Sequence, residues 1–112
     1  MAGKFLAEFE LYVMLAIAHL QDEAYGAAIR RAIEQRTGRP VSVGALYATL
    51  ARLGDKGLVS FTVSDPQPIR GGRARKYYKL TRAGHATLSH STEMLGRMMD
   101  GLRLAPISGD RS

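Results

Sequence analysis

Residues 41–58 read VSVGALYATLARLGDKGL, and this stretch decides the fold. Ser42 is a favourable N-cap residue and Gly57 is a helix terminator, so the sequence predicts a helix over residues 43–56. Its inner stripe follows the spacing i, i+3, i+7 and i+10 and comprises Val43, Leu46, Leu50 and Leu53. That spacing is typical of a helix that packs on a core along one side.

A second predicted helix precedes this one across a short turn. It covers residues 25–36, with Asp22 as a candidate cap, and its inner stripe consists of alanine and isoleucine. Residues 37–40 read TGRP, in which glycine supplies a left-handed residue past the helix end and proline blocks continuation. Two helices joined by such a turn predict a helix-turn-helix.

Two stretches rich in β-forming residues follow the helix-turn-helix. Residues 58–63 and 75–80 flank a segment, residues 64–74, that contains two prolines and two glycines. This pattern predicts a β-hairpin with a long, basic tip. Three helices followed by two strands predict a winged helix-turn-helix. In such a fold the third helix enters the major groove of DNA, and the hairpin, or wing, reaches the backbone or the minor groove.

The first and last predicted helices indicate a homodimer. Residues 7–20 are apolar on nearly all sides, which predicts burial against both the chain's own core and a partner subunit. Thr81 is a candidate cap for the last helix, which we expect to run to about residue 104. Leucines recur there at every seventh residue, a short coiled-coil-like seam that two glycines weaken. The predicted dimer residues are Phe9, Val13, Leu88, Leu95, Met98, Met99 and Leu102.

The predicted fold class is mainly α with a small β-hairpin. At 112 residues the chain has the length of one ordinary domain. We expect a winged helix-turn-helix over residues 7–80 and a dimerisation helix over residues 81–105, both in one compact unit. Residues 106–112 are predicted to be a disordered tail.

Positive charge is concentrated in the middle of the chain. The formal net charge is +6, from 16 Lys and Arg against 10 Asp and Glu. Residues 39–82 hold nine of the bases and two of the acids, a net +7, whereas the remainder holds seven bases and eight acids, a net −1. A localised basic region is typical of a protein that binds a polyanion such as double-stranded DNA.

The third helix supplies the candidate base-reading residues. An outer face is predicted at Ala45, Thr49, Arg52 and Lys56. Small residues in the N-terminal half of a recognition helix allow close approach to base edges, and Thr49 can hydrogen-bond a base or touch a thymine methyl. Ser42 marks the helix N-terminus, where a phosphate is favoured. For Arg52 and Lys56 the alternative is ordinary solvated helix charge.

The predicted wing is the second group of candidate DNA contacts. Arg73, Arg75 and Lys76 lie in or next to its tip, where guanidinium groups can bind phosphates and neighbouring glycines let the backbone approach them. A flexible basic loop without a specific partner is the alternative. Tyr25 and Tyr47 can each reach a phosphate with the hydroxyl group or pack within the protein.

The composition argues against several classes of protein. The chain has no cysteine, and its three histidines lack metal-ligand spacing, so we expect no metal and no cofactor. No nucleophile or nucleotide-loop motif indicates catalysis. The longest apolar run, near residues 11–18, is too short to span a bilayer and lacks the pattern of a signal peptide. We therefore expect a cytoplasmic protein.

Residues 12–84 resemble the PadR family of bacterial transcriptional regulators. The resemblance is carried by YVMLA at 12–16, AYG at 24–26, the run at 41–58, GGRARKYYKLT at 71–81 and AG at 83–84. It implies a winged helix-turn-helix homodimer, joined by packing of the last helix on the partner's first helix. Such regulators usually repress transcription at roughly palindromic operators. Gly54 departs from the family pattern, in which a helix-forming residue is more common.

The resemblance also implies particular contacts. The residues that would face DNA are Ser42, Ala45, Thr49 and Arg52 on the third helix, Tyr25 and Tyr47 near phosphates, and Arg73, Arg75 and Lys76 on the wing. Some short members of the family bind a flat hydrophobic ligand between the subunits, helped by a tryptophan that this chain lacks. Here Met94, Leu95, Met98 and Met99 would form a soft lining, although simple dimer packing is the favoured interpretation.

One alternative function belongs to a different class. A winged helix can serve as a protein-interaction adaptor that does not read DNA sequence. The localised positive charge argues against this alternative, because an adaptor needs no basic region around its third helix and wing.

Overall fold

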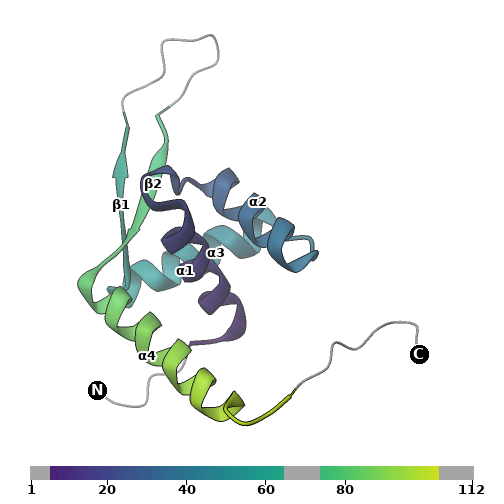
Figure 1. Cartoon of the computed structure of the whole chain (residues 1–112). Helices are drawn as coiled ribbons and strands as arrows, with labels where there is room; N and C mark the ends of the chain where they lie inside the picture. Colours follow the sequence, from purple (N-terminus) through teal and green to yellow (C-terminus); the bar gives the residue numbers. More distant parts are fainter. Residues whose placement is uncertain (1–5, 65–73, 104–112) are drawn as a thin grey trace.

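The computed structural model describes residues 6–64 and 74–103. Its elements in chain order are α1 (Glu8–Leu20), the 3₁₀ turn η1 (Gln21–Glu23), α2 (Gly26–Thr37), α3 (Val43–Asp55), β1 (Val59–Val63), β2 (Lys76–Leu80) and α4 (Arg82–Met99). Figure 1 shows α1, α2 and α3 gathered beside the hairpin, with α4 along the lower edge of the molecule. This arrangement confirms the predicted mainly α fold with one β-hairpin, a winged helix-turn-helix.

Polar side chains cap two of the helices where the sequence predicted them. The Ala45 N–H donates a hydrogen bond to Ser42 Oγ (3.1 Å) at the start of α3, and Thr81 Oγ1 accepts one from an N–H in the first turn of α4 (2.9 Å). These caps satisfy N–H groups that have no partner within the helix. The prediction for Asp22 is wrong, because Asp22 lies in η1 and Tyr25 is the N-cap of α2, without a side-chain hydrogen bond.

The hairpin is fixed to the start of α2. β1 and β2 pair antiparallel, and the other edge of β2 pairs with the segment that precedes α2. There the Tyr78 N–H donates to the Ala24 carbonyl (2.8 Å), and Tyr25 forms an isolated bridge with Tyr77. The base of the wing and the helix-turn-helix therefore form one body.

The core lies where α1, α2, α3 and the base of the hairpin meet. Its fully buried side chains include Val13 and Met14 of α1, Ile29 of α2, and Leu46 and Leu53 of α3. Replacing such a side chain by alanine typically costs about 2–5 kcal/mol, because the surrounding structure only partly fills the cavity. Since α1 contacts α2, α3, α4 and β2, it is the central element of the fold.

α4 packs on the core only through its first turns. Gly84 lies so close to the Leu58 carbonyl that a Cβ at this position would collide with it, and Leu88 is buried. The helix ends at Met99 rather than near residue 104: the backbone of Asp100 is extended (ψ 133°), and Gly101 after it takes a left-handed conformation (φ 84°). The predicted tail, residues 106–112, lies outside the described residues.

Candidate nucleic-acid interface

α3 buries one side and exposes a small-residue surface on the opposite side. Successive residues of a helix are about 100° apart, which fixes the direction that points away from the buried Leu46, Leu50 and Leu53. The exposed residues in that direction are Gly44, Ala48, Ala51 and Asp55. We call Gly44, Ala48 and Ala51 the outward surface of α3. The outer face predicted from the sequence did not include these residues. Counting half a helical turn from the leucine stripe would have identified them.

Thr49 is a correction to the predicted outer face. Its side chain is 2% exposed, and its Oγ1 accepts a hydrogen bond from Arg52 Nη2 (3.1 Å). Because Thr49 is three positions from Leu46, it lies about 60° from that leucine around the helix axis, next to the buried stripe. Thr49 is therefore not available to touch a base.

Arg52 and Lys56 form ion pairs with a buried carboxylate of α1 and are not ordinary solvated charges. Glu10 Oε2 lies 2.8 Å from Lys56 Nζ and 3.4 Å from Arg52 Nε, and Oε1 accepts a hydrogen bond from the Ala7 N–H (3.0 Å). Burial raises the pKa of Glu10, but Lys56, the Ala7 N–H and Arg52 together outweigh burial and lower it below 4.5. No sequence pattern indicated this contact, because an acid in the first turn of a helix is common. We call Glu10, Thr49, Arg52 and Lys56 the Glu10 cluster.

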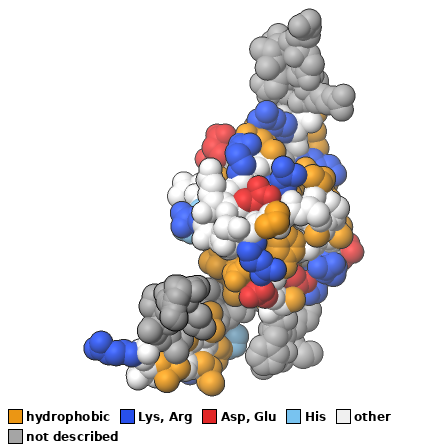
Figure 2. All heavy atoms as spheres, turned by 90° about the vertical axis from the view of Figure 1, so that its right-hand side faces the viewer, with side chains coloured by type: hydrophobic (Ala, Val, Ile, Leu, Met, Phe, Trp, Pro, Cys, Tyr) orange, Lys and Arg blue, Asp and Glu red, His pale blue; other side chains and the backbone are white. Residues whose placement is uncertain are grey.

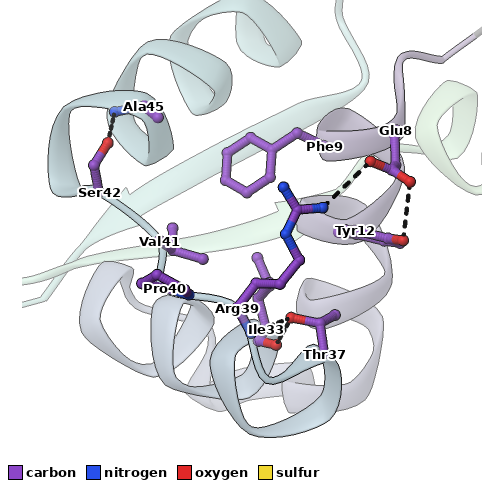
Figure 3. Close-up of a pocket in the computed structure, with 10 residues that line it drawn as sticks. All are labelled: Glu8, Phe9, Tyr12, Ile33, Thr37, Arg39, Pro40, Val41, Ser42 and Ala45. Atoms are coloured by element: carbon purple, nitrogen blue, oxygen red, sulfur yellow. Dashed lines mark hydrogen bonds and ion pairs between the residues drawn. The ribbon is translucent and has the colours of Figure 1, made fainter. Parts of the chain in front are cut away.

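Ser42 and Ala45 border a hollow on the α1 side of α3. Figure 3 shows them at one end of this hollow, with Phe9 of α1 facing them and the Arg39 side chain reaching across to Glu8. The hollow holds about 340 Å³, and the Arg39–Glu8 ion pair spans 3.7 Å. Both Ser42 and Ala45 are exposed, so they lie at the edge of the surface that α3 offers to a ligand.

Basic and aromatic side chains gather where α2 and β2 begin. Arg31 Nη2 donates a hydrogen bond to the Tyr25 hydroxyl (3.3 Å), and the Arg75 guanidinium lies over the Tyr25 ring, 4.2 Å from its centroid. Tyr77 meets the same ring edge-on, with 5.7 Å between centroids. We call these four residues the Tyr25 cluster. Figure 2 shows several Lys and Arg side chains in the upper part of the described surface, with Asp and Glu side chains between them.

The Tyr25 cluster is positively charged and has no acid in it. The Arg31 hydrogen bond is the main cause that lowers the pKa of Tyr25, and the positive charge of Arg75 lowers it further. The hydroxyl of Tyr77 is the main cause that raises the pKa of Arg75. Within the described residues, no carboxylate forms an ion pair with Arg31 or Arg75. Both guanidinium groups can therefore bind an anion from outside the chain.

Tyr47 reaches from α3 to the start of α2, next to this cluster. A Cβ at Gly26 would collide with the Tyr47 hydroxyl, so the side chain in its present position requires glycine there. Tyr47 is 46% exposed, and α2 begins here without a side-chain cap. N–H groups at such a helix start favour a phosphate or another anion.

The wing places two further side chains beside α3. Lys76 Nζ lies 4.5 Å from the centroid of the exposed Phe61 ring. Together with Tyr47, these residues line a groove of about 610 Å³ between α3 and β1. The remaining predicted wing contact, Arg73, lies outside the described residues.

The predicted dimer residues separate into two groups. Phe9 packs against the chain's own core, while Val13 and Leu88 are buried within it, so the prediction that these two contact a partner is corrected. The other four are between 46% and 78% exposed, and they are Leu95, Met98, Met99 and Leu102. Figure 2 shows hydrophobic side chains along the lower end of the molecule, over α4. Leu102 lies past the end of α4, so the seven-residue seam does not continue along one helix.

Residues 6–64 and 74–103 contain neither a metal site nor a membrane-spanning helix. No group of three or more His, Asp or Glu in these residues could hold a metal ion. No helix in these residues is long and apolar enough to cross a membrane.

The element order and the exposed third helix define the class, a winged helix-turn-helix protein. Residues 14–90 match the transcriptional regulator PadR-like family, so the chain belongs to this family. Transcriptional regulator Rv3488 of Mycobacterium tuberculosis is 40% identical over 85 residues, which are 74% of this chain and 75% of that protein. The chain is thus a PadR-like transcriptional regulator, as the sequence resemblance implied.

Solved structures show the same similarity. A PadR-like transcription factor from Bacteroides fragilis superposes with a TM-score of 0.66 at 30% identity, covering 80% of this chain and 82% of that one. RosR of H. salinarum gives a TM-score of 0.66 at 27% identity, covering 88% and 81%. PadR regulators bind DNA and are typically dimeric, and the family consists of regulators rather than enzymes.

Proposed function

We propose that this chain is a homodimeric, sequence-specific DNA-binding protein that represses transcription at a roughly palindromic operator. One observation carries the proposal: the Tyr47 hydroxyl of α3 lies against Gly26, the residue that follows Tyr25, so α3 and the basic Tyr25 cluster meet at the start of α2. A surface that admits base edges beside a surface that binds phosphates is what sequence recognition requires.

Each part of this interface has a distinct task in the proposal. The outward surface of α3 carries no side chain beyond Cβ before Asp55 at the end of the helix, so its N-terminal part can enter the major groove deeply. Tyr47, at 46% exposure, flanks this surface, and Val43, which was predicted in the inner stripe, is 52% exposed at the first turn; both can touch thymine methyl groups. Arg31 and Arg75 bind the phosphates beside the groove, and the wing, including Arg73, extends the contact to the backbone.

The second half of α4 is the proposed dimer contact. Leu95, Met98 and Met99 are exposed there at the end of a helix whose first half packs on the core. A two-fold dimer would hold two α3 helices about 34 Å apart, one turn of DNA, and would match a palindrome. A small hydrophobic ligand that entered between these adaptable side chains would disturb the dimer and release the operator.

Selection from random duplex DNA by the purified protein, near physiological salt, tests the proposal. We expect enrichment of a palindrome whose half-sites are about ten base pairs apart. If each subunit neutralises four phosphates, the logarithm of the DNA-binding constant K should fall with the logarithm of the salt concentration with a slope of about −7. A folded dimer that enriches no sequence contradicts sequence-specific recognition.

The dimer contact has its own test. We expect Leu95→Glu to produce a monomer in analytical ultracentrifugation, because two like charges would be buried at a two-fold contact. Ser89→Glu is the matched control, since Ser89 is exposed on the same helix and away from the apolar side chains. A Leu95→Glu protein that stays dimeric places the dimer contact elsewhere.

A further inference from the structure

A single buried carboxylate controls the basic side chains at the C-terminal end of α3. The Glu10 side chain is only 4% exposed, while those of Arg52 and Lys56 are 55% and 35% exposed. Nevertheless, Arg52 Nε and Lys56 Nζ lie 3.4 Å and 2.8 Å from Glu10 Oε2. Arg52 Nη2 also donates a hydrogen bond to the hydroxyl of the buried Thr49, which is a second contact that fixes this side chain.

This arrangement matters because a base on a recognition helix has two possible uses. Lysine or arginine that reaches a phosphate strengthens binding to DNA of every sequence equally. A base that is paired within the protein contributes nothing to that sequence-independent binding. Since the outward surface of α3 carries no base, Arg52 and Lys56 are the nearest cations to it on the helix.

We propose that Glu10 is a specificity-determining residue: it holds Arg52 and Lys56 against α1 and so prevents them from binding phosphates of any sequence. Glu10 acts through these two bases and is a positioning residue, without contact to DNA of its own. The inference rests on the proposed function, because it concerns the DNA that α3 would face.

The decisive variant is Glu10→Gln, which removes the charge and keeps the shape. Released from the carboxylate, Arg52 and Lys56 would each add a phosphate contact in each subunit. Each added contact steepens the slope of log K against log salt by about 0.9. Between about 50 and 200 mM salt, every added contact therefore increases the loss of affinity about 3.5-fold. We expect tighter binding to scrambled DNA at low salt, a steeper slope and a smaller ratio of operator to scrambled affinity.

Matched variants separate this effect from a change of overall charge. Glu8→Gln makes the same charge change two residues away, where the carboxylate is exposed and its ion pair to Arg39 is long, at 3.7 Å. We expect Glu8→Gln to leave the salt slope unchanged. Adding Arg52→Gln and Lys56→Gln to Glu10→Gln should return the slope to that of the unmodified protein. Fluorescence anisotropy with duplexes of equal length gives all of these slopes.

Three outcomes would overturn the proposal. Glu10→Gln could weaken binding to operator and scrambled DNA equally at an unchanged slope, which would make Glu10 a structural residue only. Glu10→Gln and Glu8→Gln could steepen the slope equally, which would make the effect one of net charge. Arg52→Gln with Lys56→Gln, with Glu10 retained, could flatten the slope by about 1.8 per subunit, which would show that both bases already bind phosphates.

The test remains decisive in two unfavourable cases. If circular dichroism shows that Glu10→Gln does not fold, the double variant of Arg52 and Lys56 decides alone. If the salt slope of this double variant equals that of the unmodified protein, the proposal is supported. If the slope is flatter, the proposal is overturned. If selection from random DNA enriches no operator, the proposed function fails, while the slopes on scrambled DNA still report whether Glu10 restrains the two bases.

Discussion

The Glu10 cluster and the Tyr25 cluster each contain two basic side chains, and the two clusters use them in opposite ways. In the Glu10 cluster, Arg52 and Lys56 converge on a buried carboxylate. In the Tyr25 cluster, Arg31 and Arg75 contact tyrosine rings and hydroxyl groups, and neither forms an ion pair within the described residues. The first cluster holds α3 on α1, whereas the second keeps its positive charge available to an anion.

The difference shows that the number of Lys and Arg residues in a region does not determine how strongly that region binds an anion. All four cations contribute to the net charge of the chain, and three of them lie in its basic middle segment. The environment of each cation decides its use, because a paired charge in a protein no longer attracts a phosphate. Substitutions in the Glu10 cluster are therefore expected to change stability, and substitutions in the Tyr25 cluster are expected to change DNA affinity.

The largest expected effect is on stability at the Glu10 cluster. We expect Glu10→Ala to lower the free energy of unfolding by about 2 kcal/mol, because charge-assisted hydrogen bonds to a buried group are lost. Urea denaturation measures this change. Glu8→Ala is the control and should cost no more than about 0.5 kcal/mol, since its ion pair is exposed. Equal losses for the two variants would remove the distinction between buried and exposed carboxylates.

The next effect is on DNA affinity at the Tyr25 cluster. We expect Arg75→Ala to weaken binding about tenfold for every sequence and to flatten the salt slope by about 1 per subunit, as loss of a phosphate contact does. Arg36→Ala, in the last turn of α2 and away from Tyr25 at its start, is the control and should change neither quantity. A loss confined to the operator would instead identify Arg75 as a base contact.

A smaller effect is expected where Tyr47 meets α2. Gly26→Ala forces the Tyr47 hydroxyl to move, which is possible because it is the far end of a side chain. We expect DNA affinity to fall about threefold, and the same substitution to have no further effect in a Tyr47→Ala background. Independent effects in this double-mutant cycle would show that Gly26 does not act on DNA affinity through Tyr47.

The smallest effect is a pH dependence confined to the Glu10 cluster. Since its partners hold the pKa of Glu10 below the ordinary value for a glutamate, its contribution to stability is present above that ordinary value and is lost as the pH falls through the lowered pKa. We expect the stability difference between the unmodified protein and Glu10→Gln to shrink as the pH falls from 7 to about 3. Chemical denaturation at each pH measures this difference, and a constant value contradicts the prediction.

Local signals in the sequence were sufficient to predict most of the fold. Ser42, Gly38 and Thr81 act within one helical turn, and the predicted helices and strands that they delimit agree with the structure to within a few residues. The early end of α4 was missed because Gly101 is tolerated in a weak helical pattern until its backbone conformation is known.

The candidate site was less predictable because its contacts join distant parts of the chain. Glu10 and Lys56 are 46 residues apart, and no periodic pattern links them. Thr49 and Val13 were misplaced for a related reason: a helix in a small domain packs on several neighbours, so its buried arc is wider than one stripe. Tyr25 and Arg75 could be named from the sequence as separate candidates, but not as members of one cluster.

The pairing of β2 with the segment before α2 has a consequence for amide exchange with solvent. β2 is hydrogen-bonded on both edges, since the Tyr78 N–H is held by Ala24, whereas β1 is the edge strand within the described part of the chain. Amides on the outer edge of β1 should therefore exchange through local fluctuations, and that of Tyr78 only when α2 separates from the hairpin. The protection of this one amide would report how tightly the two parts of the molecule are joined, before and after DNA is bound.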